Sequence, residues 1–115
     1  MQDKNCIFCN IIQGEIPSTK VYEDDLVYAF RDIAPAAPEH ILIVPKEHIC
    51  CANKLEDKHE ALVGHIVLTA AKLAKELGFA DSGYRIINNC GENAGQTVFH
   101  LHFHLLAGDT FTKLV

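Results

Sequence analysis

Large apolar residues alternate with histidines near the end of the chain, between positions 98 and 106. His100, His102 and His104 share one parity of this stretch. The other parity holds large apolar residues, namely Phe99, Leu101, Phe103 and Leu105. Because successive side chains of a β-strand point to opposite faces, this period predicts a strand with the histidines on one face and its core side on the other. Alternate imidazoles of such a strand lie roughly 6.6 Å apart, close enough to act on one small substrate.

The rest of the pattern predicts four more strands and two helices. Aliphatic and β-branched runs predict strands at 20–23, 26–31, 40–45 and 84–89. A helical period over 57–77 predicts a long helix, begun by a capping box of Asp57 with Glu60 and ended by Gly78. Asn5 is expected to cap a short helix that runs to about Gln13. These elements predict one α+β domain over 1–115, with a five-stranded antiparallel sheet in meander order and two helices.

Composition limits the classes of function. The chain has 115 residues, of which 49% are hydrophobic and 22% charged, as in an ordinary globular domain. No apolar run approaches the roughly 20 residues of a membrane span, and the polar start predicts no signal segment, so we expect a cytoplasmic protein that does not bind membranes. The net charge of −5 argues against a nucleic-acid partner.

Cysteines and histidines leave two kinds of chemistry open. In a reducing compartment, the five cysteines are expected to be free thiols or metal ligands. Cys6 and Cys9 have the Cys-x-x-Cys spacing that presents two sulfurs to one ion, whereas the βαβ context of a redox site is missing. One histidine on a strand is ordinarily solvated or hydrogen-bonded, but three in register favour either a metal site or catalysis.

Several motifs together resemble one known family. His100-Leu-His102-Phe-His104-Leu-Leu matches the histidine triad pattern, and Gly95-Gln-Thr97 precedes it as in the nucleoside phosphoramidase branch. Further matches lie in Cys6-Ile-Phe-Cys9, Glu15-Ile-Pro, Ala29-Phe-Arg-Asp-Ile-Ala-Pro, the run from Ala37 to Lys46, and Tyr84-Arg85. The chain is similar to the histidine triad nucleotide-binding (HINT-like) proteins from Cys6 to about Gly108.

The resemblance implies a covalent nucleotidyl-histidine mechanism. It makes His102 the nucleophile that attacks the α-phosphate and places His104 in contact with the phosphate. A protonated His104 or His40 could neutralise charge there and protonate the leaving amine. The remaining substrate positions that it implies are Thr97 at the phosphate, Asp32 at the ribose, Phe30 and Ile33 around the base, and Asn89 and Gln96 as polar lining. From the residues alone, Asn89 could equally be a turn former, Phe30 a core aromatic, Asp32 a cap and Thr97 an ordinary strand residue.

The resemblance also implies a metal, a partner and a substrate class. Cys6, Cys9, His48 and His100 match the zinc site of the members that carry Cys-x-x-Cys, a closed set typical of one structural zinc per chain. The long helix corresponds to the one through which members form homodimers. The implied reaction is hydrolysis of adenosine 5′-phosphoramidate-type substrates, with a purine mononucleotide as the bound group. The alternatives are a dinucleoside polyphosphate hydrolase of the same family and a non-catalytic nucleotide- or zinc-binding interaction protein.

The end of the chain departs from the family pattern. Members of the phosphoramidase branch usually continue past the triad into a tail with Trp-Pro, whereas this chain ends Ala-Gly-Asp-Thr-Phe-Thr-Lys-Leu-Val and has no Trp. That tail helps to shape the substrate pocket in the family. The preference for a leaving group therefore does not follow from the resemblance.

Overall fold

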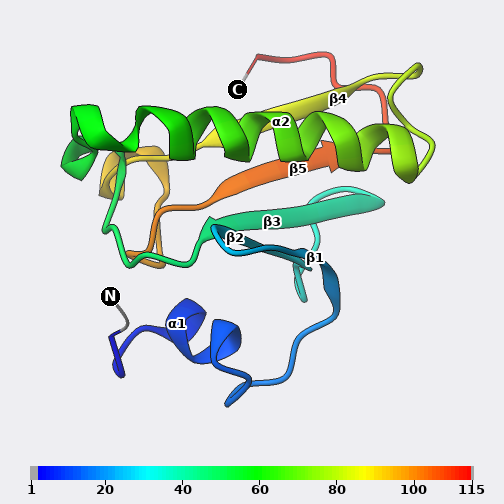
Figure 1. Cartoon of the computed structure of the whole chain (residues 1–115). Helices are drawn as coiled ribbons and strands as arrows, with labels where there is room; N and C mark the ends of the chain where they lie inside the picture. Colours follow the sequence, from blue (N-terminus) through cyan, green and yellow to red (C-terminus); the bar gives the residue numbers. More distant parts are fainter. Residues whose placement is uncertain (1–2, 115) are drawn as a thin grey trace.

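The computed structural model describes residues 3–114, whose strands form one five-stranded antiparallel sheet (Figure 1). The strands are β1 (Lys20–Glu23), β2 (Val27–Arg31), β3 (Glu39–Pro45), β4 (Tyr84–Asn88) and β5 (Phe103–Ala107). Their order across the sheet is β1-β2-β3-β5-β4. The α+β class and the antiparallel sheet are confirmed, but the predicted meander order is wrong. A long connection that contains helix α2 (Glu60–Glu76) separates β3 from β4 along the chain. In the sheet, β5 lies between these two strands and pairs with each of them.

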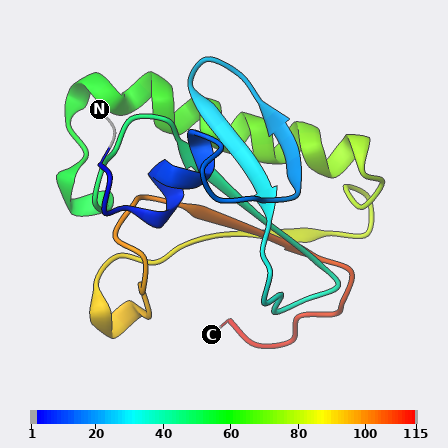
Figure 2. The same cartoon turned by 90° about the horizontal axis from the view of Figure 1, so that it is seen from below.

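The two helices cover opposite faces of the sheet, as Figures 1 and 2 show. Helix α2 buries Ile66, Ala70 and Leu73 in a core that includes Ile41 and Leu105 of the sheet. Helix α1 (Ile7–Ile12) packs on the other face, where a second apolar cluster forms. That cluster consists of Cys6, Phe8, Cys9, Ile11, Tyr28, Phe30, Leu42 and Val44. The sheet therefore has a structural core under α2 and a thinner layer under α1.

Both helices begin differently from the sequence-based expectation. Cys6, not Asn5, caps α1, because its sulfur accepts a hydrogen bond from the Cys9 N–H at 3.3 Å. The predicted capping box of Asp57 with Glu60 is also wrong. A 3₁₀ turn (Asp57–His59) precedes α2, and the His59 ring accepts the Glu56 N–H at 3.0 Å in place of the expected carboxylate. The end of α2 is as predicted, because Gly78 has the positive φ of +88° that favours glycine.

The histidine-bearing segment is a strand only in its second half. β5 starts at Phe103, so His100 and His102 lie in the irregular segment before it. Phe99 is 46% exposed, and its predicted place on the core side is wrong. The Leu101 N–H donates to the Ile49 carbonyl at 2.6 Å, which holds this segment against the loop after β3 instead of in a continuous ladder. His100 and His102 both contact Phe8 of α1, so they face the α1 side of the sheet.

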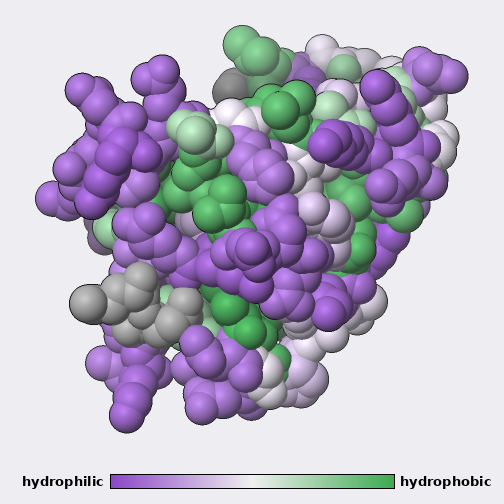
Figure 3. All heavy atoms as spheres, viewed as in Figure 1, coloured by the Kyte–Doolittle hydropathy of each residue, from purple (hydrophilic) through white to green (hydrophobic). Residues whose placement is uncertain are grey.

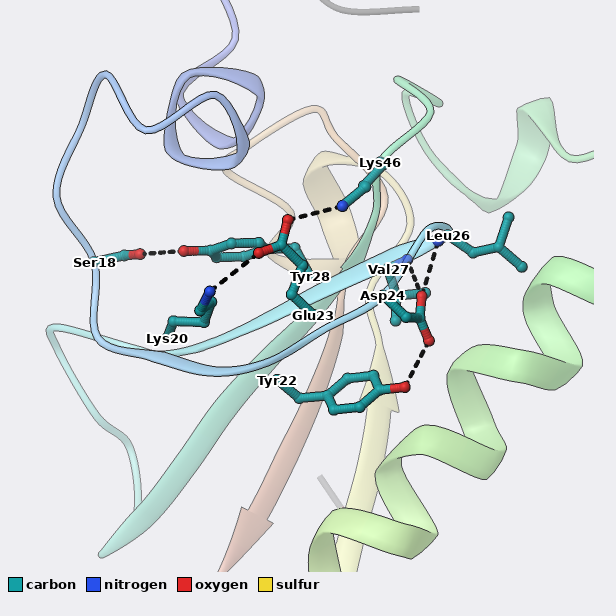
Figure 4. Close-up of polar contacts among 9 residues, drawn as sticks. All are labelled: Ser18, Lys20, Tyr22, Glu23, Asp24, Leu26, Val27, Tyr28 and Lys46. Carbon is teal, nitrogen blue, oxygen red and sulfur yellow. Dashed lines mark hydrogen bonds and ion pairs between the residues drawn. The ribbon is translucent and has the colours of Figure 1, made fainter.

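The turn between β1 and β2 is organised by the carboxylate of Asp24 (Figure 4). One oxygen accepts the N–H groups of Leu26 and Val27 at 2.8 and 2.9 Å, and the other accepts the Tyr22 hydroxyl at 2.7 Å. The His65 ring of α2 lies 2.6 Å from that second oxygen. This contact joins α2 to the hairpin at the edge of the sheet.

The outer face of α2 carries apolar side chains among polar ones, and Figure 3 shows both kinds over this helix. Leu68 is 59% exposed, and Val67 is also exposed. None of the helices formed by residues 3–114 is long and apolar enough to cross a membrane.

Candidate active site and metal centre

Four predicted metal ligands come together beneath α1. Cys6 and Cys9 lie at its first turn, His48 follows β3, and His100 precedes β5. The Nδ1 atom of His100 lies 3.3 Å from the Cys6 sulfur and 3.5 Å from the Cys9 sulfur. His48 Nδ1 lies 3.3 Å from the Cys9 sulfur. The four ligand atoms all lie within 4.8 Å of one another, so they form a cluster that could bind a metal ion.

The protonation of this cluster fits a cation. His100 Nε2 donates to the Pro45 carbonyl at 2.8 Å, so the neutral ring presents an unprotonated Nδ1 to the two sulfurs. Burial lowers the pKa of His100 to about 4, and the neighbouring His48 and His102 act in the same direction. Burial raises the pKa of the Cys9 thiol to about 11, with Cys6 adding to the effect. A bound cation would reverse this rise, because a coordinating thiol loses its proton.

A backbone carbonyl sets the tautomer of His102. Its Nδ1 lies 2.7 Å from the His100 carbonyl, which can only accept, so the neutral ring carries its proton on Nδ1 and keeps its lone pair on Nε2. The Asn88 amide donates to the His102 carbonyl at 2.9 Å. The ring meets Phe8 edge to face, with centroids 5.1 Å apart. His102 is therefore held in the tautomer in which Nε2 can act as a nucleophile.

His40 fixes the tautomer of His104 in turn. The Ala36 N–H donates to His40 Nδ1 at 2.9 Å, which leaves the proton of the neutral ring on Nε2. That atom lies 2.8 Å from His104 Nδ1 and 3.4 Å from the Asp32 carboxylate. The shorter hydrogen bond runs from His40 to His104, so the His104 proton sits on its own Nε2. His104 can then donate this proton in a hydrogen bond to an anion.

Both of these histidines are neutral in the free protein at neutral pH. Burial lowers the pKa of His40, although the carboxylate of Asp32 opposes the shift. Burial also lowers the pKa of His104 to about 4, reinforced by His102 and His40 and opposed by Asp32. The sequence-based expectation of a protonated ring at the phosphate therefore requires a bound anion that raises the pKa.

A cavity of about 380 Å³ lies beside His102 and His104. Four of the predicted substrate residues line it, namely Phe30, Asp32, Ile33 and Thr97. Phe30 is buried at its floor, whereas Ile33 is 97% exposed. Asp32 forms the cap that the residues alone allowed, because one carboxylate oxygen accepts the Ala34 N–H at 2.8 Å. The other oxygen lies 3.4 Å from His40 Nε2.

Three predicted site residues lie behind or away from the cavity walls. His40 is buried behind His104. Gln96 is 4% exposed, and its amide donates to the Cys50 and Val98 carbonyls while its oxygen accepts the Gly91 N–H. Asn89 is partly buried after β4 and is not among the lining residues. Gln96 therefore shapes the loop before the triad, whichever part it takes in binding.

The sequence reasoning missed most of the apolar wall and one positioning residue. The apolar lining comes chiefly from α1 and the segment after it, in Ile7, Phe8, Ile11, Ile16 and Pro17, with Leu42 and Val98 opposite. Leu42 pairs with His104 across β3 and β5, so its place beside the triad depends on the strand order. Asn88, which holds the His102 backbone, is the neighbour of the predicted Asn89. A sharper prediction of the end of β4 could have indicated it.

The site thus combines a nucleophilic imidazole, a second imidazole that can donate to an anion, and an apolar cavity with a carboxylate at its rim. A family model for the HIT domain matches residues 13–111. The chain belongs to the HIT domain family, as its triad and fold together indicate.

Individual relatives agree closely with this chain. A purine nucleoside phosphoramidase of Escherichia coli strain K12 is 51% identical over 102 residues, which cover 89% of this chain and 86% of the relative. A histidine triad protein from Clostridium difficile has 52% identity and a TM-score of 0.96, with 100% of each chain covered. A HIT family hydrolase from Clostridium thermocellum has 50% identity and a TM-score of 0.95, covering 99% of this chain and 100% of that one.

Proposed function

We propose that this protein is a purine nucleoside phosphoramidase that hydrolyses AMP-linked amines to AMP and the free amine in the cytoplasm. The observation that carries the proposal is the hydrogen bond from His102 Nδ1 to the His100 carbonyl, which leaves Nε2 unprotonated beside a nucleotide-sized cavity. The similarity to the Escherichia coli phosphoramidase supports the choice of substrate.

His102 carries the covalent step. Its Nε2 attacks the α-phosphorus, a new P–N bond to the ring forms, and the P–N bond to the amine breaks. The amine takes the bonding electron pair and one proton. The His100 carbonyl, which accepts the Nδ1 proton at 2.7 Å, favours the positive charge that develops on the ring. Water then attacks the same phosphorus, and AMP leaves with His102 restored.

His104 supplies the proton that the amine needs. A phosphate oxygen that accepts the Nε2 proton of His104 adds negative charge beside the ring and raises its pKa from about 4. His40 orients the neutral His104 through the 2.8 Å hydrogen bond to Nδ1. When His104 takes up a proton at Nδ1, the His40 N–H would donate instead to the Asp32 carboxylate, which lies 3.4 Å from His40 Nε2. An imidazole with a pKa moved toward neutrality can protonate the leaving nitrogen and recover a proton from water.

The rest of the nucleotide fits the cavity from its rim to its floor. Thr97 is exposed and lines the cavity, so its hydroxyl can donate to the phosphate. Asp32 can accept hydrogen bonds from the ribose hydroxyls. Phe30, Ile33 and the apolar residues of α1 offer flat and aliphatic surfaces for a purine. Gln96 contributes by holding together the loops that carry Cys50 and Gly91, whereas Asn89 follows β4 and does not line the cavity.

Zinc is the metal that the four-ligand cluster suits. Two thiolates and two imidazoles are the donor set of closed, tetrahedral zinc sites, and His100 already presents an unprotonated nitrogen. The ion would connect α1, which forms one wall of the cavity, to the segment that carries His102. We assign one structural zinc to each chain on this basis.

The experiment compares His102→Ala with the wild type on adenosine 5′-phosphoramidate. Removal of the nucleophile should lower turnover by a factor on the order of 10⁴ or more. AMP binding, measured by calorimetry, should persist, which controls for folding of the site. Rapid acid quench and mass spectrometry should find an AMP adduct on His102 of the wild type. More than a tenth of wild-type turnover in the variant would contradict the covalent mechanism.

A further inference from the structure

Three cysteines outside the metal cluster lie close together at one end of the sheet. Cys50 and Cys51 belong to the loop after β3, and Cys90 follows β4. All three are free thiols and partly exposed. Neither Cys51 nor Cys90 lines the cavity beside His102. The reaction proposed above leaves these two thiols without a role.

Buried Gln96 holds the two cysteine-bearing loops against each other. Its amide nitrogen donates to the Cys50 carbonyl at 2.9 Å, and its amide oxygen accepts the Gly91 N–H at 2.9 Å. These two hydrogen bonds fix the backbone next to Cys51 and next to Cys90. The thiol of Cys51 interacts with both the Cys50 and the Cys90 thiols.

Cys51 is the thiol suited to react first. The Cys50 thiol, followed by the Asn53 N–H, stabilises its thiolate and lowers the pKa of Cys51 against the opposing effect of burial. A thiolate attacks a disulfide, whereas a thiol does not. The exposure of Cys51 allows a small disulfide molecule to reach it.

Geometry favours Cys90 over Cys50 as the second partner. Consecutive α-carbons lie about 3.8 Å apart across a trans peptide, shorter than the roughly 4.4–6.8 Å usual for a disulfide. A Cys50–Cys51 bond would therefore distort the backbone. Cys90 comes from a separate loop, so no peptide bond fixes the distance between its α-carbon and that of Cys51.

We propose that Cys51 and Cys90 form a reversible disulfide, a modification site that responds to low-molecular-weight disulfides such as glutathione disulfide. The Cys51 thiolate attacks one sulfur of glutathione disulfide, and one glutathione thiolate leaves. The Cys90 thiolate then attacks the Cys51 sulfur of the mixed disulfide, and the second glutathione leaves. The two cysteines lose two electrons and two protons, and glutathione disulfide is reduced to two glutathione molecules.

The cross-link would stabilise the fold without changing the reaction. It would join the loops after β3 and β4 beside Gln96, and it would close the chain segment that contains α2 and β4. Cross-linking a long segment restricts the unfolded chain and raises the midpoint of thermal unfolding. Because the bond lies off the cavity, kcat should stay within about twofold of the reduced protein.

The test uses the full-length, metal-loaded protein in buffers of varied glutathione redox ratio, with free thiols alkylated before mass spectrometry. The wild type should lose the mass of two hydrogens and yield a peptide that links Cys51 to Cys90. Its unfolding midpoint should rise by at least about 5 °C. Cys50→Ser, the matched control, should reach the same disulfide and the same midpoint at equilibrium, although more slowly, because it lacks the thiol that stabilises the Cys51 thiolate.

The Cys90→Ser variant separates the proposed pair from general thiol reactivity. It should stop at a mixed disulfide of Cys51 with glutathione and show no rise in its unfolding midpoint. A Cys50–Cys51 peptide, a mixed disulfide that persists in the wild type, a link between two chains, or an unchanged midpoint in the oxidised wild type would each overturn the proposal. These readouts do not depend on the phosphoramidase activity.

Discussion

The three histidines of the triad have different roles because each ring meets a different hydrogen-bond partner. His100 donates to the Pro45 carbonyl and turns its other nitrogen toward the cysteines. His102 donates to the His100 carbonyl. His104 accepts from His40. Under the proposed function, one alternating motif would thus provide a metal ligand, a nucleophile and a donor to an anion within five residues.

The lowered pKa of His104 predicts proton uptake when a phosphodiester binds. At pH 6 the ring is neutral in the free protein, because its pKa lies at about 4. A bound anion raises that pKa, so binding should draw part of a proton from solution. Calorimetry of an AMP methyl ester, in buffers that differ in ionisation enthalpy, measures this uptake. The ester has no proton of its own to exchange near neutral pH.

His104→Gln is the matched variant for this experiment. It keeps a donor at the position but cannot titrate, so the uptake should disappear while binding weakens by about tenfold or less. Uptake that is equal in the variant and the wild type would place the proton on another group.

The four metal ligands predict a zinc content of one per chain in protein purified without added metal. Cys6→Ser/Cys9→Ser should hold no zinc and unfold at least about 5 °C lower, because the proposed ion would join α1 to the sheet. Cys50→Ser/Cys51→Ser removes the same number of thiols and should keep its zinc. Metal analysis and thermal unfolding check both variants. A wild type that stays free of zinc even when zinc is supplied would leave the cluster with another role.

At the scale of elements, Asp24 joins the β1–β2 turn to α2. Burial disfavours its charge, but hydrogen bonds from Tyr22, the turn backbone and His65 outweigh that effect, so the pKa of Asp24 lies well below its usual range. Asp24→Ala should therefore destabilise the fold by about 1–3 kcal/mol at pH 7, since two turn N–H groups lose their acceptor. Asp25→Ala, at the exposed neighbour, should cost little.

The same reasoning gives the pH dependence of this contribution. A carboxylate with a lowered pKa stabilises the fold above the pKa of the unfolded state, near 3.9, and loses that effect as the pH falls through the lower folded value. Denaturant unfolding at pH 7 and at pH 3 measures the difference between Asp24→Ala and the wild type. The difference should shrink at pH 3, and a gap that stays constant would assign it to packing instead.

Local sequence patterns were sufficient to predict that the strands and helices exist, but not all of their bounds and not their arrangement. The strands and the end of α2 follow from apolar runs and from Gly78, which act over a few residues. The place of β5 between β3 and β4 depends on where α2 crosses the sheet, which no local pattern specifies. Cys6 and His59 were missed at the helix starts because neither is a common capping residue.

The residues of the candidate site could likewise be predicted only in part from the sequence. Spacing alone indicated only the Cys6 and Cys9 pair, and the family resemblance added His48 and His100. The structure brings all four residues together in one cluster. The spacing of residues in the sequence does not predict the orientation of the Asn88 and Gln96 side chains. Which of two adjacent asparagines faces His102, and whether a glutamine faces the cavity or the loop backbone, depends on loop geometry that only the folded chain determines.

At the scale of the whole molecule, we predict that the exposed face of α2 forms the homodimer interface that the family resemblance implies. Leu68 is exposed there among small residues, which would let two helices approach closely. Leu68→Glu should shift the protein from dimer to monomer in sedimentation experiments at micromolar concentration. Leu114→Glu, which adds the same charge at an exposed position elsewhere, should leave the dimer intact. A monomeric wild type would contradict the assignment of this face.

Charge decides between an amine and a polyphosphate as the leaving group. The chain carries a net charge of −5, and the residues from Leu105 to Asp109 add an acid and no cation after the triad. Arg31 lines the cavity, but its guanidinium lies 2.6 Å from the Glu39 carboxylate, and the lining contains no lysine. Two further phosphates would therefore meet little positive charge, and repulsion of about 1 kcal/mol or more would discriminate several-fold against them.

Leaving-group chemistry and fit should enlarge that difference, because an amine leaves without added negative charge once it is protonated. We expect kcat/KM for an AMP-linked primary amine to exceed that for diadenosine triphosphate by at least about a hundredfold. Steady-state assays of both substrates at equal ionic strength measure the ratio. Raising the salt concentration should reduce the ratio of the two kcat/KM values by no more than the several-fold factor that charge repulsion contributes. Salt screens charges but does not change how the substrate fits the cavity. Comparable values for the two substrates would instead assign the protein to the polyphosphate hydrolases of its family.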